Sequence, residues 1–175
     1  MDFREINEFF KDTFKYILVI VGVLILFIYI VSFQMVVGES MNPNYDSQDI
    51  VVVSKISTKL FEPKRDDVVV FEYNGLKNLI KRVVGLPGDK VVYKDNVLYI
   101  NDEVYDFDYE VNGKTQDFNS ASLGSEVIPE GSYILLGDNR VNSMDSREIG
   151  FVKEDDIVGK VVFRFWPLNK FGFAK

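Results

Sequence analysis

YILVIVGVLILFIYIVSFQMVVG, residues 16–38, is the stretch that divides this chain into two parts. It carries no charged residue, and as an α-helix it would extend ~35 Å, compared with ~30 Å for the hydrocarbon core of a bilayer. We therefore predict one membrane-spanning helix over residues 16–38. A lead-in on the cytosolic side, residues 1–15, precedes it, and a single domain, residues 39–175, follows it.

Two other interpretations of residues 16–38 are weaker. A buried core helix would need protein on all its sides, which a domain of this size cannot provide. A cleaved secretory signal has a shorter apolar region, of roughly 7–15 residues, and ends at a small-x-small site that Val36-Val37-Gly38 matches poorly. We therefore expect a retained anchor.

The orientation of the anchor follows from its flanking charges. Arg4, Lys11 and Lys15 precede the apolar stretch, and no basic residue follows it before Lys55. Because basic residues are retained on the cytoplasmic side, we expect a single-pass anchor with a cytosolic N-terminus and an extracytoplasmic domain.

Composition excludes several kinds of function. The net charge of −7 and the pI of about 4.7 argue against a nucleic-acid partner, which needs a basic surface. The chain has no histidine and no cysteine, which rules out Ser-His and Cys-His catalysis and the usual zinc ligands. Hydrolytic chemistry would have to use a Ser or Thr with a Lys, or carboxylates, and we expect no metal and no cofactor.

The domain after the anchor has the pattern of β structure. Short β-branched or aromatic runs alternate with turn sequences, and they predict strands at residues 50–54, 68–73, 79–84, 90–93, 97–100, 132–136 and 157–165. This pattern predicts an all-β, antiparallel, partly closed barrel-like domain. Residues from about 102 to 130 are less regular, and we expect a small β insertion there.

Three polar positions stand out against this background. Ser40 follows the apolar stretch directly, where most serines would be solvated loop residues. Lys81 lies in a predicted strand with apolar neighbours on both faces, where it would lose its water shell and its pKa would fall; otherwise its amine reaches solvent from an edge strand. Ser143 lies in the polar loop GDNRVNSMDSR, residues 137–147, which by itself could be only an elaborate turn.

Taken together, three motifs resemble those of one family, the bacterial type I signal peptidases. The motifs are SMNP at residues 40–43, KRVVGLPGD at residues 81–89 and GDNRVNSMDSR at residues 137–147, in that order behind one anchor. The likeness extends to the sequence FRFWP at residues 163–167, and the short insertion with a single anchor resembles the Gram-positive branch. It implies an antiparallel β domain that carries a smaller β insertion.

The resemblance also implies residue roles. Ser40 corresponds to the nucleophile, Lys81 to the general base and Ser143 to the serine that orients the lysine. The charged residues of the same motifs correspond to those that support the site, and they are Arg82, Asp138, Asp145 and Arg147. Two positions depart from the family pattern. Asn44 replaces a threonine, and Gly38 stands where some members have a hydroxyl that helps to hold the oxyanion.

A Ser-Lys endopeptidase of this kind removes signal peptides from exported preproteins after small residues at −1 and −3. We expect the substrate to add as a strand beside the site, with Met41, Leu79 and Ile80 forming shallow apolar pockets. The partners would be preproteins and the lipid bilayer, and the enzyme would be a monomer.

Two other functions remain open from the sequence. A self-cleaving Ser-Lys repressor shares the chemistry but is cytosolic and has a DNA-binding head. A membrane-anchored β module that only binds a partner would not need Ser40, Lys81 and Ser143 together.

Overall fold

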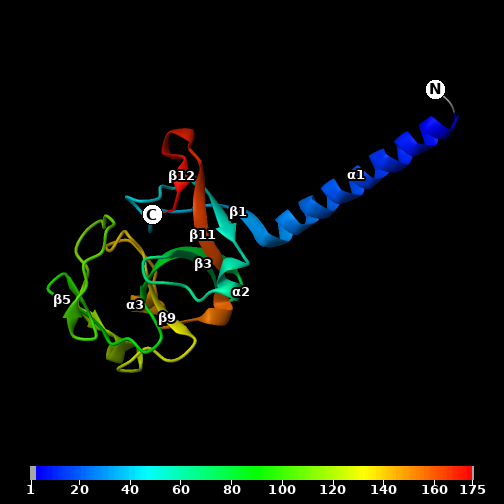
Figure 1. Ribbon diagram of the computed structural model, residues 1–175. Helices are drawn as coiled ribbons and strands as arrows, with labels where there is room; N and C mark the ends of the chain where they lie inside the picture. Colours follow the sequence, from blue (N-terminus) through cyan, green and yellow to red (C-terminus); the bar gives the residue numbers. More distant parts are fainter. Residues whose placement is uncertain (1–2, 175) are drawn as a thin grey trace.

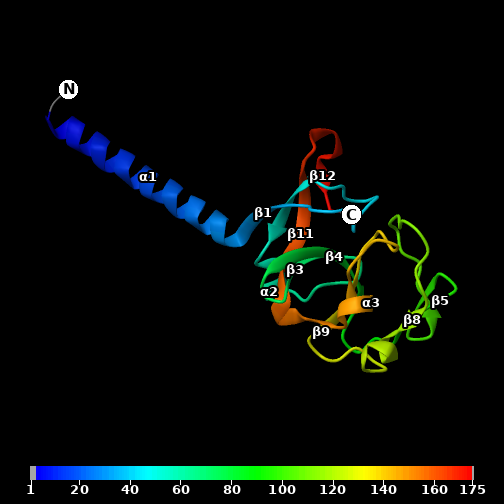
Figure 2. The same cartoon turned by 180° about the vertical axis from the view of Figure 1, so that it is seen from behind.

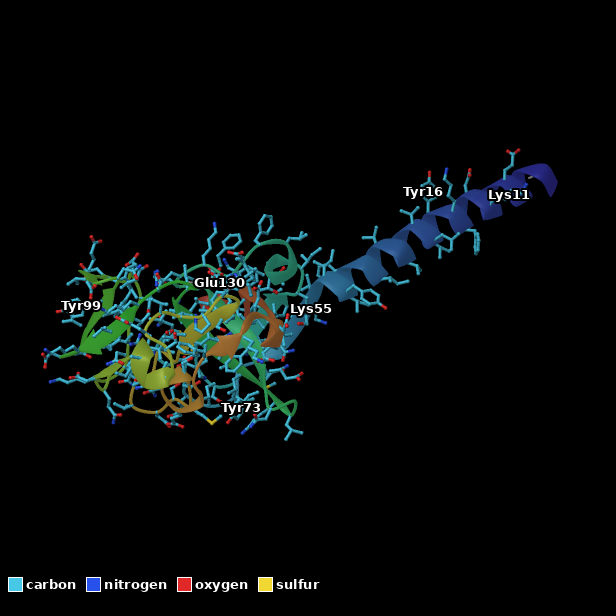
Figure 3. The ribbon with its side chains drawn as sticks, turned by 90° about the horizontal axis from the view of Figure 1, so that it is seen from below. Lys11, Tyr16, Lys55, Tyr73, Tyr99 and Glu130 are labelled. Carbon is cyan, nitrogen blue, oxygen red and sulfur yellow. The ribbon has the colours of Figure 1, made fainter. Side chains whose placement is uncertain are left out.

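The computed structural model describes residues 3–174 as one long helix and a β domain (Figure 1). The helix α1 (Phe3–Ile30) projects away from the domain in both ribbon views, and its first turns are the part of the chain farthest from it (Figures 1 and 2). Its segment Lys11–Ile30 is long and apolar enough to cross a membrane, and none of that segment is buried against the domain. Figure 3 shows Lys11 and Tyr16 on this free part of the helix and Lys55 close to its junction with the domain.

The predicted helix over residues 16–38 is wrong at its C-terminal end. Residues after Ile30 form the strand β1 (Val31–Met35), which pairs with β2 (Ile50–Ser54). The backbone N–H of Lys55 donates to the carbonyl of Ile30 at 2.8 Å, which continues this pairing to the end of the helix. The β domain therefore begins at Val31, and backbone pairing, not the end of the apolar stretch, terminates the helix.

The main sheet has eight strands in the order β1-β2-β11-β3-β4-β9-β10, with β12 paired to β11. Its pairings are antiparallel. Its other strands are β3 (Val68–Tyr73), β4 (Lys77–Gly85), β9 (Ser132–Leu136), β10 (Val152–Lys153), β11 (Ile157–Trp166) and β12 (Gly172–Phe173). The described end strands β1 and β10 do not pair with each other, so the predicted partly closed architecture is confirmed.

A second sheet lies beside the main one, on the side away from α1 (Figure 2). Its strand order is β7-β6-β5-β8, and its strands are β5 (Val91–Lys94), β6 (Val97–Ile100), β7 (Glu103–Val104) and β8 (Phe118–Asn119). The small insertion predicted for residues 102–130 therefore starts too late, because the second sheet already begins at Val91. The sequence pattern of β5 and β6 predicts strands but does not indicate to which sheet they belong.

Local sequence explains the hairpins of both sheets. Asn74 and Gly75 join β3 to β4 with φ of 54° and 65°, and Asp95 and Asn96 join β5 to β6 with φ of 51° and 66°. Two consecutive residues with positive φ give the turn whose twist matches antiparallel strands, and Asn, Asp and Gly adopt it most easily. These turns fix the strand registers on which the positions of β4 side chains depend.

The strands bury three apolar clusters. One lies under β2, β3 and β11, one between the second sheet and β9, and one between β3, β4 and β9. Helical segments in the domain are short: α2 (Ser57–Leu60), α3 (Ser146–Ile149), η1 (Ser120–Leu123), η2 (Glu154–Asp156) and η3 (Leu168–Lys170). All five residues of β9 are buried, so the loop that follows β9 starts from a rigid position.

Candidate active site

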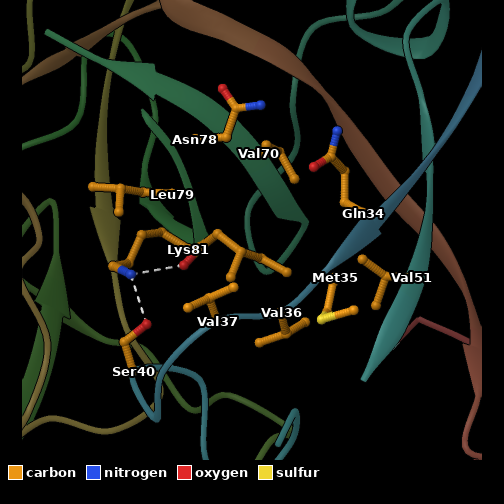
Figure 4. Close-up of a pocket in the computed structure, with 11 residues that line it drawn as sticks. Gln34, Met35, Val36, Val37, Ser40, Val51, Val70, Asn78, Leu79 and Lys81 are labelled. Atoms are coloured by element: carbon orange, nitrogen blue, oxygen red, sulfur yellow. Dashed lines mark hydrogen bonds between the residues drawn. The ribbon is translucent and has the colours of Figure 1, made fainter. Parts of the chain in front are cut away.

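Ser40 and Lys81 lie side by side at the mouth of an apolar pocket (Figure 4). Lys81 Nζ lies 2.8 Å from Ser40 Oγ and also donates to the carbonyl oxygen of Ile80 at 2.8 Å. Only 2% of Lys81 is exposed, so the alternative in which its amine reaches solvent is wrong. Burial lowers the pKa of the Lys81 amine to about 8, while the carboxylates of Asp145 and Asp138 act in the opposite direction.

The pairing of β4 leaves an open strand edge that ends at Lys81. β4 pairs with β3 along residues 77–82, but it pairs with β9 only from Arg82 onward. On the side away from β3, residues 77–81 therefore have no partner among the described strands. Such an open edge can accept an added peptide strand, and it ends at Lys81.

The loop after β9 holds the backbone of the nucleophile segment. The N–H of Asn139 donates to the carbonyl of Ser40 at 2.9 Å, and its Nδ2 donates to the carbonyl of Glu39 at 3.1 Å. Gly137 packs so closely that an added Cβ would lie 2.5 Å from the Ser40 carbonyl oxygen and 2.1 Å from Ser143 Oγ. These contacts fix the position of the Ser40 backbone relative to the loop after β9.

A buried ion pair supports the strand that carries Lys81. The guanidinium of Arg82 donates to both carboxylate oxygens of Asp138, at 2.8 and 2.7 Å, and to the carbonyl of Asp66 at 2.9 Å. Its charge also lies 4.0 Å from the ring centre of Tyr109. Arg82 and Asp138, expected only to support the site, form an ion pair in which both charges are satisfied although both side chains are buried.

Asn44 joins the same network from the other side. Its amide donates to Asp138 Oδ2 at 2.9 Å and to the carbonyl of Glu110 at 2.7 Å. A threonine hydroxyl carries a single donor, whereas the amide group supplies two. Asn44, in place of the usual threonine, therefore adds a hydrogen bond between the segment that follows Ser40 and the segment around Glu110, between β7 and β8.

A second ion pair holds the loop after β9. Arg147 donates to both oxygens of the Asp145 carboxylate, each at 2.8 Å, and to the carbonyl of Arg140 at 2.7 Å. Burial raises the pKa of the Asp145 carboxyl, but Arg147 and the N–H of Gly137 outweigh burial, so its pKa is lowered. Asp145 is therefore ionised and neutralised in place, as predicted for a supporting residue.

Ser143 lies beside Gly137 and forms no hydrogen bond with Lys81 among residues 3–174. Its Oγ is buried and has no hydrogen-bond partner in the described part of the chain. It lies close to Gly137 and to the carboxylate of Asp145, whose pKa it helps to lower. The role of orienting Lys81 remains a prediction that no hydrogen bond in this structure supports.

The pocket beside the pair differs in one wall from the predicted one. Leu79 and Ile80 line it, as expected, but Met41 is fully buried in the core cluster under β2 and β3 and does not. Met35, the last residue of β1, and the two residues after it, Val36 and Val37, take its place (Figure 4). Sequence reasoning missed them because the helix was expected to continue to residue 38.

The site has no evident metal ligands. Among residues 3–174 no three Asp or Glu side chains lie close enough to hold a metal ion. The Ser40 hydroxyl and the Lys81 amine are the two reactive groups that the structure brings into contact. Burial of the amine makes it a base of moderate strength, adjacent to a hydroxyl that it can deprotonate.

Comparison with known proteins agrees with this chemistry. Residues 9–166 match the family described as Signal peptidase, peptidase S26. The chain is 41% identical over 163 residues to signal peptidase I of Bacillus caldolyticus, covering 88% of each chain. It is 41% identical over 181 residues to signal peptidase IB of Staphylococcus aureus, covering 93% of this chain and 94% of the relative.

A solved structure is similar as well. The crystal structure of a signal peptidase I from Enterococcus faecalis has a TM-score of 0.52 and 38% sequence identity. The match covers 58% of this chain and 97% of the other.

The close packing at Gly137 leads to a test of the site geometry. Gly137→Ala should displace Ser40 from Lys81 and slow the acylation of Ser40 by an activated ester about tenfold or more, because small displacements strongly slow oriented reactions. The rate is measured by mass spectrometry of the peptide that contains Ser40. Gly172→Ala, which has nothing within 4 Å of the added Cβ, is the control and should react like the wild type. A wild-type rate in Gly137→Ala would contradict the described packing.

Proposed function

The chain belongs to peptidase family S26, the signal peptidases, and we propose that Ser40 and Lys81 are the catalytic dyad with which it cleaves signal peptides from exported preproteins. The observation that carries this assignment is the 2.8 Å distance between Lys81 Nζ and Ser40 Oγ, with the amine buried. The family match and the relatives favour neither a silent binding module nor a self-cleaving repressor.

The proposed reaction has two stages. The neutral amine of Lys81 takes the proton of Ser40 Oγ while that oxygen bonds to the carbonyl carbon of the scissile peptide, and the N–H of Ser40 donates to the oxyanion. The protonated Lys81 gives its proton to the leaving nitrogen as the C–N bond breaks. Lys81 then deprotonates a water that attacks the acyl-serine, and the signal peptide leaves with a new carboxylate as Ser40 regains its proton.

The pocket supports the proposed preference for small residues. Its volume is about 70 Å³, and Leu79, Ile80 and Val36 are among its apolar walls. A signal peptide added along the open edge of β4 would alternate its side chains, so every second residue would face this small pocket. That periodicity accounts for small residues at −1 and −3.

The proposed topology places the active site at the outer membrane surface. We assign the N-terminus to the cytosol from the basic residues before the span and the domain from Val31 onward to the outside. Only β1 and the short loop after it separate the end of the helix from Ser40. The dyad would then lie where the apolar segment of a substrate leaves the bilayer. We also propose that the enzyme is a monomer.

The domain carries an aromatic surface that we expect to touch the bilayer. Four rings of the aromatic C-terminal segment are exposed, namely Phe165, Trp166, Phe171 and Phe173. Phe165 packs against Phe33 of β1 with ring centres 5.5 Å apart, so this surface continues into the strand that follows the membrane helix. Phe163 is half-buried and packs against Phe171 and Phe173. Aromatic rings at such a place favour the headgroup level of a membrane.

Removal of either partner of the dyad tests the catalytic assignment. Ser40→Ala and Lys81→Ala should each reduce cleavage of a labelled preprotein by a factor of about a thousand or more, because the two groups act as a unit. Lys153→Ala, which changes an exposed lysine on β10, is the matched control for the lost charge. A cleavage rate within about tenfold of the wild-type rate in either folded dyad variant would contradict the assignment.

The pH dependence tests the protonation state of the base. The active form of Lys81 is deprotonated, so kcat/KM should rise with pH and level off above the pKa of about 8. Burial raises the pKa values of Tyr105 and Tyr133 to about 12, so these groups stay protonated over this range. The measurement is kcat/KM from pH 6 to 10, and a rate that still climbs at pH 10 would show that Lys81 retains an ordinary pKa.

A truncated protein tests membrane contact by the domain itself. The truncation should remove residues 1–30 and keep β1, which is part of the sheet. We expect it to sediment with liposomes and the fluorescence of Trp166, the only tryptophan, to shift to the blue. The double variant Phe171→Ser, Phe173→Ser should bind more weakly. If neither sedimentation nor a shift is seen, the helix is the only membrane contact.

A further inference from the structure

The open edge of β4 determines where a bound peptide must leave the sheet. A peptide added along residues 77–81 would lie on the line that β9 follows from Leu136, since β9 pairs with β4 from Arg82 onward. It cannot continue along that line, because Gly137 and the loop after it begin there. Past Ser40, the peptide therefore has to turn outward over the loop of residues 138–145.

The direction of the peptide follows from the proposed preference for small residues at −1 and −3. The small pocket for these residues is lined by Leu79 and Ile80, on the open edge of β4 that ends at Lys81. The signal peptide, whose apolar segment is in the bilayer, occupies that side. The residues after the cleaved bond, which begin the mature protein, then pass over the loop after β9. That loop lies between the main and the second sheet in both ribbon views (Figures 1 and 2).

A separate cavity opens on this side of the nucleophile. Its volume is about 480 Å³, and Ser143 is one of its walls. Ser143 Oγ and the Ser40 carbonyl both lie close to Gly137, so the loop that lines the cavity also contacts the nucleophile segment. Its other wall is formed by Lys114 and Gln116, in the segment before β8. This segment is held against the loop after β9 by backbone hydrogen bonds of Asn112 with Asp138 and Arg140, at 2.9 and 2.8 Å.

The charge of this cavity is opposite to that of the whole chain. Its basic residues are Lys114, Arg140 and Arg147, and its one acidic residue is Glu148, in a protein whose net charge is −7. Arg147 is neutralised by Asp145, but Arg140 is only 2% exposed and has no carboxylate partner among the described residues. Its Nη1 donates to Thr115 at 3.0 Å, and its Nε and Nη2 have no hydrogen-bond partner there. Its guanidinium lies over the rings of Tyr93 and Phe107, at 5.3 and 5.7 Å from their centres, and these rings do not neutralise its charge, so it attracts a nearby anion.

We infer that this cavity receives the first residues of the mature protein and favours an acidic side chain among them. The carboxylate of that side chain would contact the exposed amine of Lys114. The inference rests on the proposed function and adds to it a specificity on the leaving side of the cleaved bond. Lys114 is exposed, and Arg140 is buried in the wall of the same cavity. An incoming carboxylate would therefore contact Lys114 and be attracted by both charges.

The test uses the full-length enzyme in detergent and a series of preproteins that share one signal peptide. The substrates carry Asp, Asn or Lys at one of the first few mature positions. In the wild type, at least one position should give a kcat/KM about fivefold higher with Asp than with Lys, the size expected for a partly exposed charge pair. Lys114→Glu should bring that ratio close to one or invert it.

The control has the same change of charge elsewhere. Lys153→Glu alters an exposed lysine on β10 that does not line the cavity, and it should keep the wild-type ratio. Cleavage at the same bond without any preference for Asp, or a preference that Lys114→Glu leaves unchanged, would overturn this inference while the proposed function stands. Failure to cleave any of the substrates would instead contradict the proposed function itself, and this inference with it.

Discussion

The rest of the site depends on one unfavourable placement, a lysine amine buried against a serine hydroxyl. Desolvation lowers the pKa of Lys81 from 10.5 to about 8. Between those two pH values the unfolded chain binds the proton and the folded chain does not, so the free energy of unfolding rises with pH across this range. Below about pH 8 the fold carries the full cost, about 3 kcal/mol. The surrounding structure has to offset it.

The two ion pairs limit how far neighbouring charges oppose this effect. Asp145 and Asp138 both raise the pKa of Lys81, and each is paired with an arginine, Arg147 or Arg82, at hydrogen-bond distance. Pairing each carboxylate with a cation weakens its pull on the lysine proton. The same two pairs anchor β4 and the loop after β9, so the groups that help to keep the pKa of Lys81 low also position Ser40 beside it.

Much of this arrangement could be predicted from the sequence. The β-branched runs predict most strands of the domain, and the three motifs identify the dyad and the four charged residues that form the two ion pairs, but not that Arg82 pairs with Asp138. β1 was missed because its apolar residues continue those of the helix, although VSFQM alternates apolar and polar positions. Backbone pairing with β2 decides that boundary, and it depends on residues far along the chain. Met41 was misplaced because a loop has no periodicity that indicates which side chains are buried.

The central claim is that burial beside Ser40 lowers the pKa of the Lys81 amine to about 8, so that the uncharged form is present at mildly alkaline pH. The most direct measurement is a titration of that amine by NMR, with ¹³C-labelled lysine in the intact protein in detergent. The signal is assigned by its loss in Lys81→Met. We predict a midpoint near pH 8. A midpoint above about 10, the value of a solvated lysine, would contradict the account.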